Sequence, residues 1–240
     1  MHQIIPGNLS HNHVEISESK TLVSIPFHNF FLNAYLYLPE QPVALIIFSH
    51  GSGSSRFSPR NNYIAESLYR NNMAALLADL LTPKEDAAIQ NRFNISLLTE
   101  RLTRLTQWAT QLPQLKNLPV GFFGASTGTA SAINAAAFLG NQIKAVVSRG
   151  GRPDLATKNA LKTVKCPTLL IIGSLDYEVV KLSRKVFQKM KCTKHIDIVQ
   201  GASHLFEETG KLHIVSRLAE DWFEKYLVKP FAAEQQSYLS

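Results

Sequence analysis

Short apolar runs that alternate with segments of helical periodicity constrain the fold of this 240-residue chain more than any other feature. Residues 43–48 form a continuous apolar run, as expected of a strand buried on both faces of a sheet. Other strand candidates are residues 22–27, 31–38, 74–78, 120–123, 143–147, 168–172 and 195–199. Helical periodicity marks residues 62–69, 95–111, 127–138, 180–190 and 212–227. Strand followed by helix, repeated, predicts an α/β fold with a mostly parallel sheet and helices on both faces.

The same pattern predicts how the chain is organised. No helical segment separates the first two strands, so we expect them to form an antiparallel, hairpin-like edge of the sheet. The chain has no internal repeat and no low-complexity linker, and α/β folds of this length commonly form one domain. We therefore expect a single domain over residues 1–240, with the mostly polar residues 229–240 packing loosely.

Composition and the N-terminal sequence indicate the expected cellular location and the state of the cysteines. The N-terminus lacks the basic start and apolar stretch of a secretory signal, and no apolar run approaches the roughly 20 residues that cross a membrane. A cytoplasmic protein with no membrane partner is therefore expected. The two cysteines, Cys166 and Cys192, provide neither a disulfide framework nor a metal-ligand cluster, so two reduced thiols are expected.

The net charge of +7 is concentrated in one segment. Residues 158–194 contain nine basic residues against Asp176 and Glu178. Much of the surplus lies in residues 181–191, where apolar side chains recur at roughly helical spacing, so the solvated face of a surface helix explains it. Without clustered RNA-reading aromatics, zinc-finger spacing or a basic tail, no nucleic-acid partner is expected.

The most informative motif is Gly-Ala-Ser-Thr-Gly at residues 124–128. It follows the strand candidate 120–123 and precedes a small-residue helix, and ligands of open α/β sheets bind beyond such carboxyl ends. A serine on this sharp turn projects its hydroxyl above the sheet, and the two glycines let strand and helix approach closely. Chance produces the pattern too, as a Gly/Ser-rich connection without chemistry, but its strand-turn-helix context favours Ser126 as a nucleophile.

A nucleophilic serine needs a base and a third group that fixes the tautomer of the base. Asp176 follows the strand candidate 168–172, and His204 lies in a loop before the final helix. The order Ser126, Asp176, His204 is the one expected of α/β hydrolases. Glu178 and Asp154 are alternatives for the acid.

Three other histidines compete with His204 as the base. His195 lies within a strand candidate, His213 begins a helix, and His50 precedes the serine by a whole loop. His204 is therefore favoured.

The negative charge that develops on the substrate also needs hydrogen-bond donors, commonly backbone N–H groups from the residue after the nucleophile and from the loop after the third strand. Thr127 supplies the first. The Gly/Ser-rich loop at residues 49–55 supplies the second, with Ser52 favoured and Gly53 as the alternative.

With these residues assembled, the chain resembles the α/β-hydrolase superfamily, particularly its dienelactone-hydrolase-like branch of small enzymes. The resemblance covers nearly the whole chain and rests on residues 50–53, 124–128, Gly173 with Asp176, and residues 201–204. It implies an eight-stranded sheet with little or no lid, an acyl-enzyme mechanism without metal or other cofactor, and a small ester substrate. Dienelactone hydrolases use a cysteine nucleophile, so Ser126 is more similar to the nucleophile of general carboxylesterases.

Two loops similar to those of a subgroup of this branch, residues 55–62 and 148–154, contain arginines on the expected active-site edge. These are Arg56, Arg60, Arg149 and Arg152. They could bind a carboxylate or phosphate bidentately, which suggests an anionic substrate. Alternatively, they pair with Asp154, Asp79 or Glu85 and hold the loops in place.

The function indicated by these residues is hydrolysis of a carboxylic ester, or a related acyl bond, of a small molecule through an acyl-enzyme on Ser126, and the arginine loops suggest that this molecule is anionic. An acyltransferase or a thioesterase would use the same three residues. A non-catalytic interaction protein on a hydrolase scaffold is the remaining alternative, although such proteins usually lose a catalytic residue.

Overall fold

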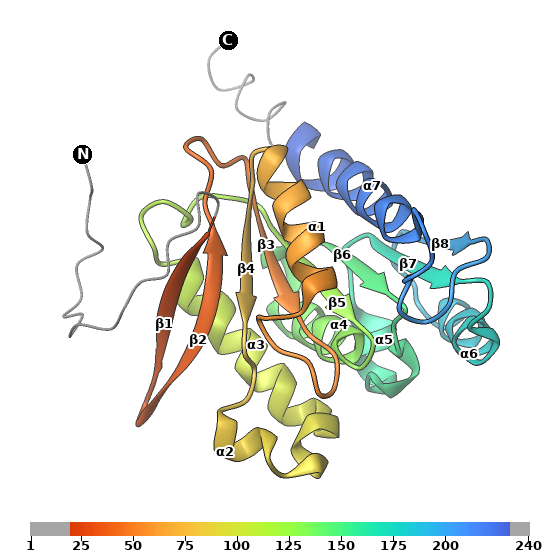
Figure 1. Cartoon of the computed structure of the whole chain (residues 1–240), viewed down its shortest axis with the longest axis horizontal. Helices are drawn as coiled ribbons and strands as arrows, with labels where there is room; N and C mark the ends of the chain where they lie inside the picture. The colour runs from red at the N-terminus through yellow and green to blue at the C-terminus, as the bar shows by residue number, and fades with distance from the viewer. Residues whose placement is uncertain (1–19, 231–240) are drawn as a thin grey trace.

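The computed structural model describes residues 20–230, which contain one eight-stranded sheet with helices on both faces (Figure 1). The strands are β1 (Thr21–Phe27), β2 (Phe30–Tyr37), β3 (Ala44–Ser49), β4 (Met73–Ala78), β5 (Val120–Ala125), β6 (Ile143–Arg149), β7 (Thr168–Gly173) and β8 (Lys194–Val199). Their order in the sheet is β1-β2-β4-β3-β5-β6-β7-β8. β2 runs antiparallel to both β1 and β4, and all other neighbours are parallel. The predicted mostly parallel sheet with an antiparallel edge is confirmed.

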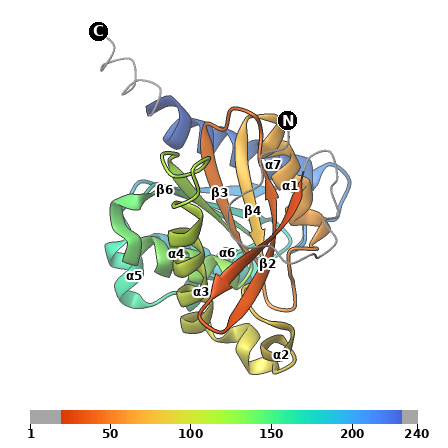
Figure 2. The same cartoon turned by 90° about the vertical axis from the view of Figure 1, so that its left-hand side faces the viewer.

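The helices form two layers. They are α1 (Pro59–Arg70), α2 (Pro83–Asp86), α3 (Ile95–Ala109), α4 (Gly128–Leu139), α5 (Lys158–Thr163), α6 (Tyr177–Phe187) and α7 (Lys211–Phe223). Short turns of other helix types are η1 (Ile89–Phe93), η2 (Gly140–Gln142), η3 (Pro153–Leu155) and η4 (Glu224–Val228). Figure 2 shows α1 and α7 against one face of the sheet and α3, α4 and α5 against the other.

β3 shows how the apolar runs specify two cores. Every residue of the strand is at most 1% exposed, and alternate side chains belong to different clusters. Leu45 and Ile47 pack with residues of α3 and α4, whereas Ile46 and Phe48 pack with residues of α1 and α7. Because side chains alternate along a strand, a continuous apolar run fills both layers. The central strands are thereby held from both sides, and their carboxyl ends share one edge.

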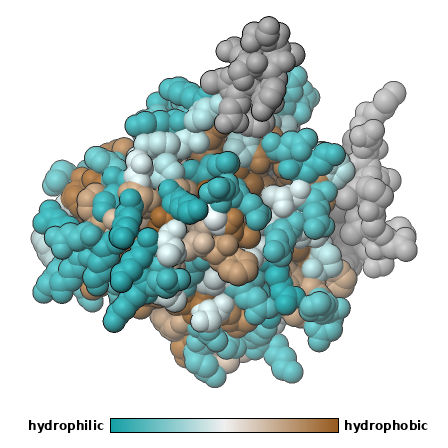
Figure 3. Space-filling model, turned by 180° about the vertical axis from the view of Figure 1, so that it is seen from behind, coloured by the Kyte–Doolittle hydropathy of each residue, from teal (hydrophilic) through white to brown (hydrophobic). Residues whose placement is uncertain are grey.

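Surface side chains agree with the predicted origin of the basic segment. On α6, Val179 and Val186 are buried while Lys181, Arg184 and Lys185 are exposed, as expected of an amphipathic surface helix. The face seen in Figure 3 is mostly hydrophilic, with apolar areas between the polar ones. No helix within residues 20–230 combines the length and the apolar character that a membrane span requires.

The structure also adds elements that periodicity did not predict. α2 and α5 contain four and six residues, too few for a helical repeat to become visible in the sequence. α6 begins at Tyr177, three residues before the expected 180. The loose packing expected for residues 229–240 falls almost entirely on residues 231–240, which lie outside the described part.

Candidate active site

Ser126 lies on a strained turn between β5 and α4. Its φ is 49°, in the left-handed region that residues with a side chain rarely adopt. A Cβ atom at Gly128 would lie 2.1 Å from the carbonyl oxygen of Ser49, and one at Gly124 would lie 2.6 Å from the Cα of Thr129. Both glycines are therefore needed, because β3, β5 and α4 converge too closely for side chains. The turn has the geometry predicted from residues 124–128.

Backbone hydrogen bonds fix this turn to the loop after β6. The Ser126 N–H donates to the Arg149 carbonyl over 3.2 Å, and the Arg152 N–H donates to the Ser126 carbonyl over 3.0 Å. The position of Ser126 is thus set by two neighbouring strands.

Asp176 and His204 are in direct contact although 28 residues separate them. The distance from His204 Nδ1 to Asp176 Oδ2 is 2.6 Å. A carboxylate acceptor places the proton on Nδ1, so Nε2 is free to accept one. A Cβ at Gly150 would lie 3.6 Å from His204 Cε1, so the imidazole packs over the residue next to Arg149. Within residues 20–230 no hydrogen bond joins the Ser126 hydroxyl to the His204 ring.

The other candidates for the acid and the base make different contacts or are exposed. Asp154 forms two hydrogen bonds of 2.8 Å with Arg152. His195 lies on β8 with its side chain 60% exposed, and His213 is exposed on α7. Among the histidines of residues 20–230, His204 is the one that contacts Asp176.

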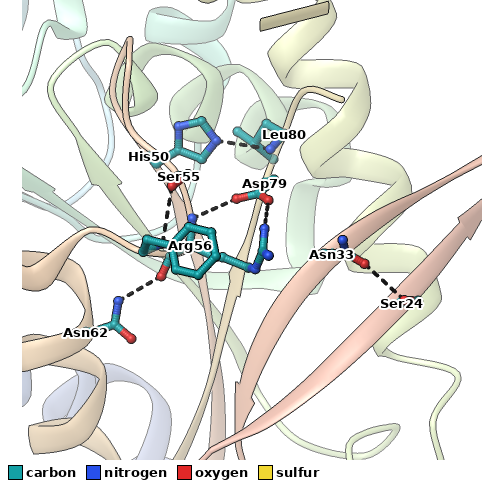
Figure 4. A network of polar contacts seen from close by, with 9 residues as sticks. Ser24, Asn33, His50, Ser55, Arg56, Asn62, Asp79 and Leu80 are labelled. Atoms are coloured by element: carbon teal, nitrogen blue, oxygen red, sulfur yellow. Dashed lines mark hydrogen bonds and ion pairs between the residues drawn. The ribbon is translucent and has the colours of Figure 1, made fainter. Parts of the chain in front are cut away.

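His50 is buried and joins two loops (Figure 4). Its Nε2 accepts a hydrogen bond of 3.0 Å from the Leu80 N–H, so the proton lies on Nδ1 and is donated to the Gly51 carbonyl over 2.9 Å. The loop after β3 is thereby tied to the loop after β4. The backbone N–H of Arg56 and its guanidinium both bind Asp79, which strengthens the link. This linking role of His50 was not predicted from the sequence, although its place directly after a buried strand was an available signal.

We expect the free energy of unfolding to fall in mild acid because of His50. Burial lowers the pKa of His50 below its usual 6.5, since the charged ring would lose its hydration. The unfolded chain then binds a proton more readily than the folded one, so stability is lost as pH falls from about 6.5 toward the folded pKa. The limiting slope is about 1.4 kcal/mol per pH unit.

Urea unfolding between about pH 5.5 and about pH 7 measures this slope. It should be smaller in His50→Gln and unchanged in His28→Gln, which alters an exposed histidine in the β1–β2 turn. An equal slope in wild type and His50→Gln would assign the titration to another group.

The backbone donors expected for the oxyanion lie beside the turn. The Ser52 N–H donates to the Thr127 hydroxyl over 2.8 Å, so the loop after β3 reaches the start of α4. We predicted that the Ser52 N–H is available to the oxyanion, and this prediction needs correction. A substrate oxygen would first have to replace the Thr127 hydroxyl as the acceptor of this N–H. The backbone N–H of Thr127 meets no acceptor in the part of the chain that the structure describes, and Gly53 adopts a φ of 67° in the same loop.

Three of the four arginines expected on one rim form ion pairs within residues 20–230. Arg56 pairs with Asp79, Arg152 with Asp154, and Arg60 with Glu207. The first two pairs are those that the alternative interpretation named. The hydrogen bonds that Arg152 donates to Asp154 raise the pKa of Arg152. Glu85, the third acid considered, pairs with Arg101.

Arg149 differs from the other three arginines. It is 7% exposed, and no carboxylate among residues 20–230 forms an ion pair with it. Burial, and secondarily the charge of Arg60, lowers the pKa of Arg149 to about 10. Nothing in the amino-acid sequence indicates this difference between Arg149 and the other three arginines.

Two other features of the described residues bear on ligands. An open groove of about 790 Å³ lies between α3, α4 and α5, and none of its lining residues belongs to the predicted site. No three His, Cys, Asp or Glu side chains within residues 20–230 gather in a way that could hold a metal ion.

The fold and the strained serine turn define the class of this protein: it is an α/β hydrolase. Comparison with known families is more specific. The model of the dienelactone hydrolase family matches residues 32–228, and the chain belongs to this family.

Individual relatives agree with this assignment. The crystal structure of a dienelactone hydrolase from Anabaena variabilis shares 45% identity and a TM-score of 0.83, covering 87% of this chain and 98% of that one. Est1E from Butyrivibrio proteoclasticus has a TM-score of 0.73 at 17% identity, covering 85% of this chain and 98% of that one, and shows the shared fold. A Mycobacterium tuberculosis protein provisionally named a phosphoribosyl transferase is 47% identical over 196 residues, which are 82% of this chain but 44% of that protein. The chain thus spans less than half the length of this relative.

Proposed function

We propose that the protein hydrolyses a carboxylic ester, or a related acyl bond, of a small molecule through an acyl-enzyme on Ser126. The observation that carries the proposal is the 2.6 Å hydrogen bond between His204 and Asp176. It fixes the tautomer that leaves Nε2 able to accept a proton, as a general base for a serine must. The strained turn at Ser126 supports the proposal, because it is the geometry that exposes a nucleophilic hydroxyl.

In the proposed reaction, the Ser126 oxygen attacks the ester carbonyl while His204 Nε2 takes its proton. The oxyanion that forms is stabilised by the Thr127 N–H and by a second donor from the loop after β3, either Ser52 or Gly53. His204 then protonates the departing alcohol, and water deprotonated by His204 attacks the acyl-enzyme to release the acid. The Ser126 hydroxyl and the His204 ring form no hydrogen bond within residues 20–230. In many hydrolases the distance between the serine and its base shortens when the substrate binds.

Hydrolysis is favoured over acyl transfer by the exposure of the base. The His204 side chain is 39% exposed, so water reaches it without a conformational change. A transferase or a thioesterase would use the same three residues and differ in the acceptor or leaving group. Product analysis with an added alcohol separates transfer from hydrolysis.

The proposal predicts covalent labelling of Ser126 by a fluorophosphonate probe. We expect the wild-type protein to gain one probe adduct, and peptide mass spectrometry to locate it on Ser126. The matched control is Ser96→Ala, which alters an exposed serine on α3 and should label like wild type. Folded wild-type protein that stays unlabelled would contradict the proposal, and would favour a non-catalytic binding role.

A further inference from the structure

The loop that carries His204 is bent at both ends. Gly201 adopts a φ of 68°, and Phe206 adopts a φ of 58°, which its side chain disfavours. Within residues 20–230 the backbone N–H and C=O of His204 form no hydrogen bond. The position of the imidazole therefore depends on the contacts that hold the neighbouring residues of this loop.

The first part of the loop is tied to the loop after β7. The Leu175 N–H donates to the Ala202 carbonyl over 3.0 Å, and the Gly201 N–H donates to the Ser174 hydroxyl over 2.8 Å. These hydrogen bonds join the two loops that carry the proposed acid and the proposed base. They end two residues before His204, so they do not by themselves set the direction of its side chain.

Glu208 holds the residue that directly precedes the base. Both carboxylate oxygens of Glu208 accept the Ser203 N–H, each over 3.1 Å. Hydrogen bonds from Ser203 lower the pKa of Glu208 below its usual 4.5, so the carboxylate is charged at neutral pH. A charged acceptor binds a backbone N–H more strongly than a neutral one does. Glu208 is thus the side chain whose hydrogen bond reaches closest to His204 along the backbone.

Glu208 is itself fixed by the start of α7. Its carbonyl accepts a hydrogen bond of 2.9 Å from the N–H of Lys211, the first residue of that helix. The adjacent Glu207 makes a different contact, because it pairs with Arg60 of α1 over 2.7 Å. Of these two neighbouring glutamates, Glu208 is the one that links the His204 loop to the last helix.

We propose that Glu208 is a positioning residue, which sets the direction of the His204 ring through the Ser203 N–H. The inference rests on the proposed role of His204 as the general base. Phe206 is only 1% exposed, so its ring anchors the far end of the loop. The freedom gained when the carboxylate is removed therefore falls on residues 203–205, which include the base. Because a base must face its nucleophile within hydrogen-bond reach, the loss acts on the chemical step.

The kinetic test compares two substitutions at one position. Glu208→Ala removes both acceptors, and kcat on short-chain nitrophenyl esters should fall about 10- to 100-fold while KM changes little. Glu208→Gln keeps one oxygen that can accept the Ser203 N–H, and it should recover most of the lost activity. Glu207→Gln, at the adjacent glutamate, should match wild type. If Glu208→Ala does not fold, Glu208→Met, of similar length to glutamate, takes its place.

Two kinetic results would overturn the proposal. One is a kcat of Glu208→Ala within about twofold of wild type. The other is an equal loss in the alanine and glutamine variants, which would show that the accepting oxygen has no part in the effect.

A spectroscopic test does not depend on esterase activity. The Nδ1 proton of His204, held against Asp176 over 2.6 Å, should give a downfield proton NMR signal in protein labelled with ¹⁵N-histidine. This signal should broaden or move upfield in Glu208→Ala and persist in Glu208→Gln and Glu207→Gln. The same change in a wild-type protein that proves inactive on esters would keep the positioning role and reject the proposed function. An unchanged signal in folded Glu208→Ala would reject the positioning role.

Discussion

Replacing Ser126 with alanine is expected to lower kcat/KM on short-chain nitrophenyl esters by about 10⁴- to 10⁶-fold. Alanine removes the nucleophilic oxygen but keeps the Cβ atom, so the tight packing around the turn is unchanged. The strain of the positive φ is present in both proteins, and the unfolding midpoint should stay close to that of wild type. Steady-state kinetics and thermal unfolding of the same preparations provide the two measurements.

The control for this experiment is Ser96→Ala, which should match wild type in both measurements. Ser126→Ala protein that is folded and retains more than about one hundredth of wild-type activity would rule out Ser126 as the nucleophile.

Replacing Asp176 with asparagine is expected to lower kcat by about 10³- to 10⁴-fold. The asparagine amide is close in shape to the carboxylate, but it no longer requires the proton to stay on Nδ1 of His204. The ring can then present N–H rather than a lone pair to Ser126, and the imidazolium formed during the reaction loses its adjacent negative charge. Measuring kcat and KM separately tests the assignment, because the loss should fall on kcat.

Two matched variants test the other acids considered. Glu178→Gln alters a carboxylate two residues from Asp176, in the first turn of α6. Asp154→Asn breaks a pair with Arg152. Both should retain most of the activity, and a loss in Glu178→Gln equal to that in Asp176→Asn would move the assignment to Glu178.

Local features of the sequence were sufficient to predict most of the fold. Each predicted strand corresponds to an observed one, because strands such as β3 are buried on both faces and their residues must be apolar. The positions of Ser126, Asp176 and His204 were also predictable, since each follows the end of a recognisable strand. Carboxyl ends of parallel strands share one edge of a sheet, so residues far apart in the sequence meet there.

Partners of the polar side chains were not predictable in the same way. Arg56, Arg149 and Arg152 have similar settings in the sequence, yet two are paired and one is buried without a carboxylate. The difference depends on which loops lie side by side, and neither periodicity nor spacing encodes that. The hydrogen bond of the Ser52 N–H was unpredictable for the same reason, because its acceptor, the Thr127 hydroxyl, is 75 residues away in the sequence.

The hydrogen bonds by which His50 joins the loops after β3 and β4 affect how this enzyme can be engineered. Because one buried ring ties Gly51 to Leu80, the wall of the site on that side behaves as a single rigid part. Leu175 and Tyr177, which flank Asp176 in the sequence, are 50% and 75% exposed and not buried in the core. Directed evolution of the proposed esterase activity should therefore begin at these exposed positions, where side chains can vary at little cost to folding.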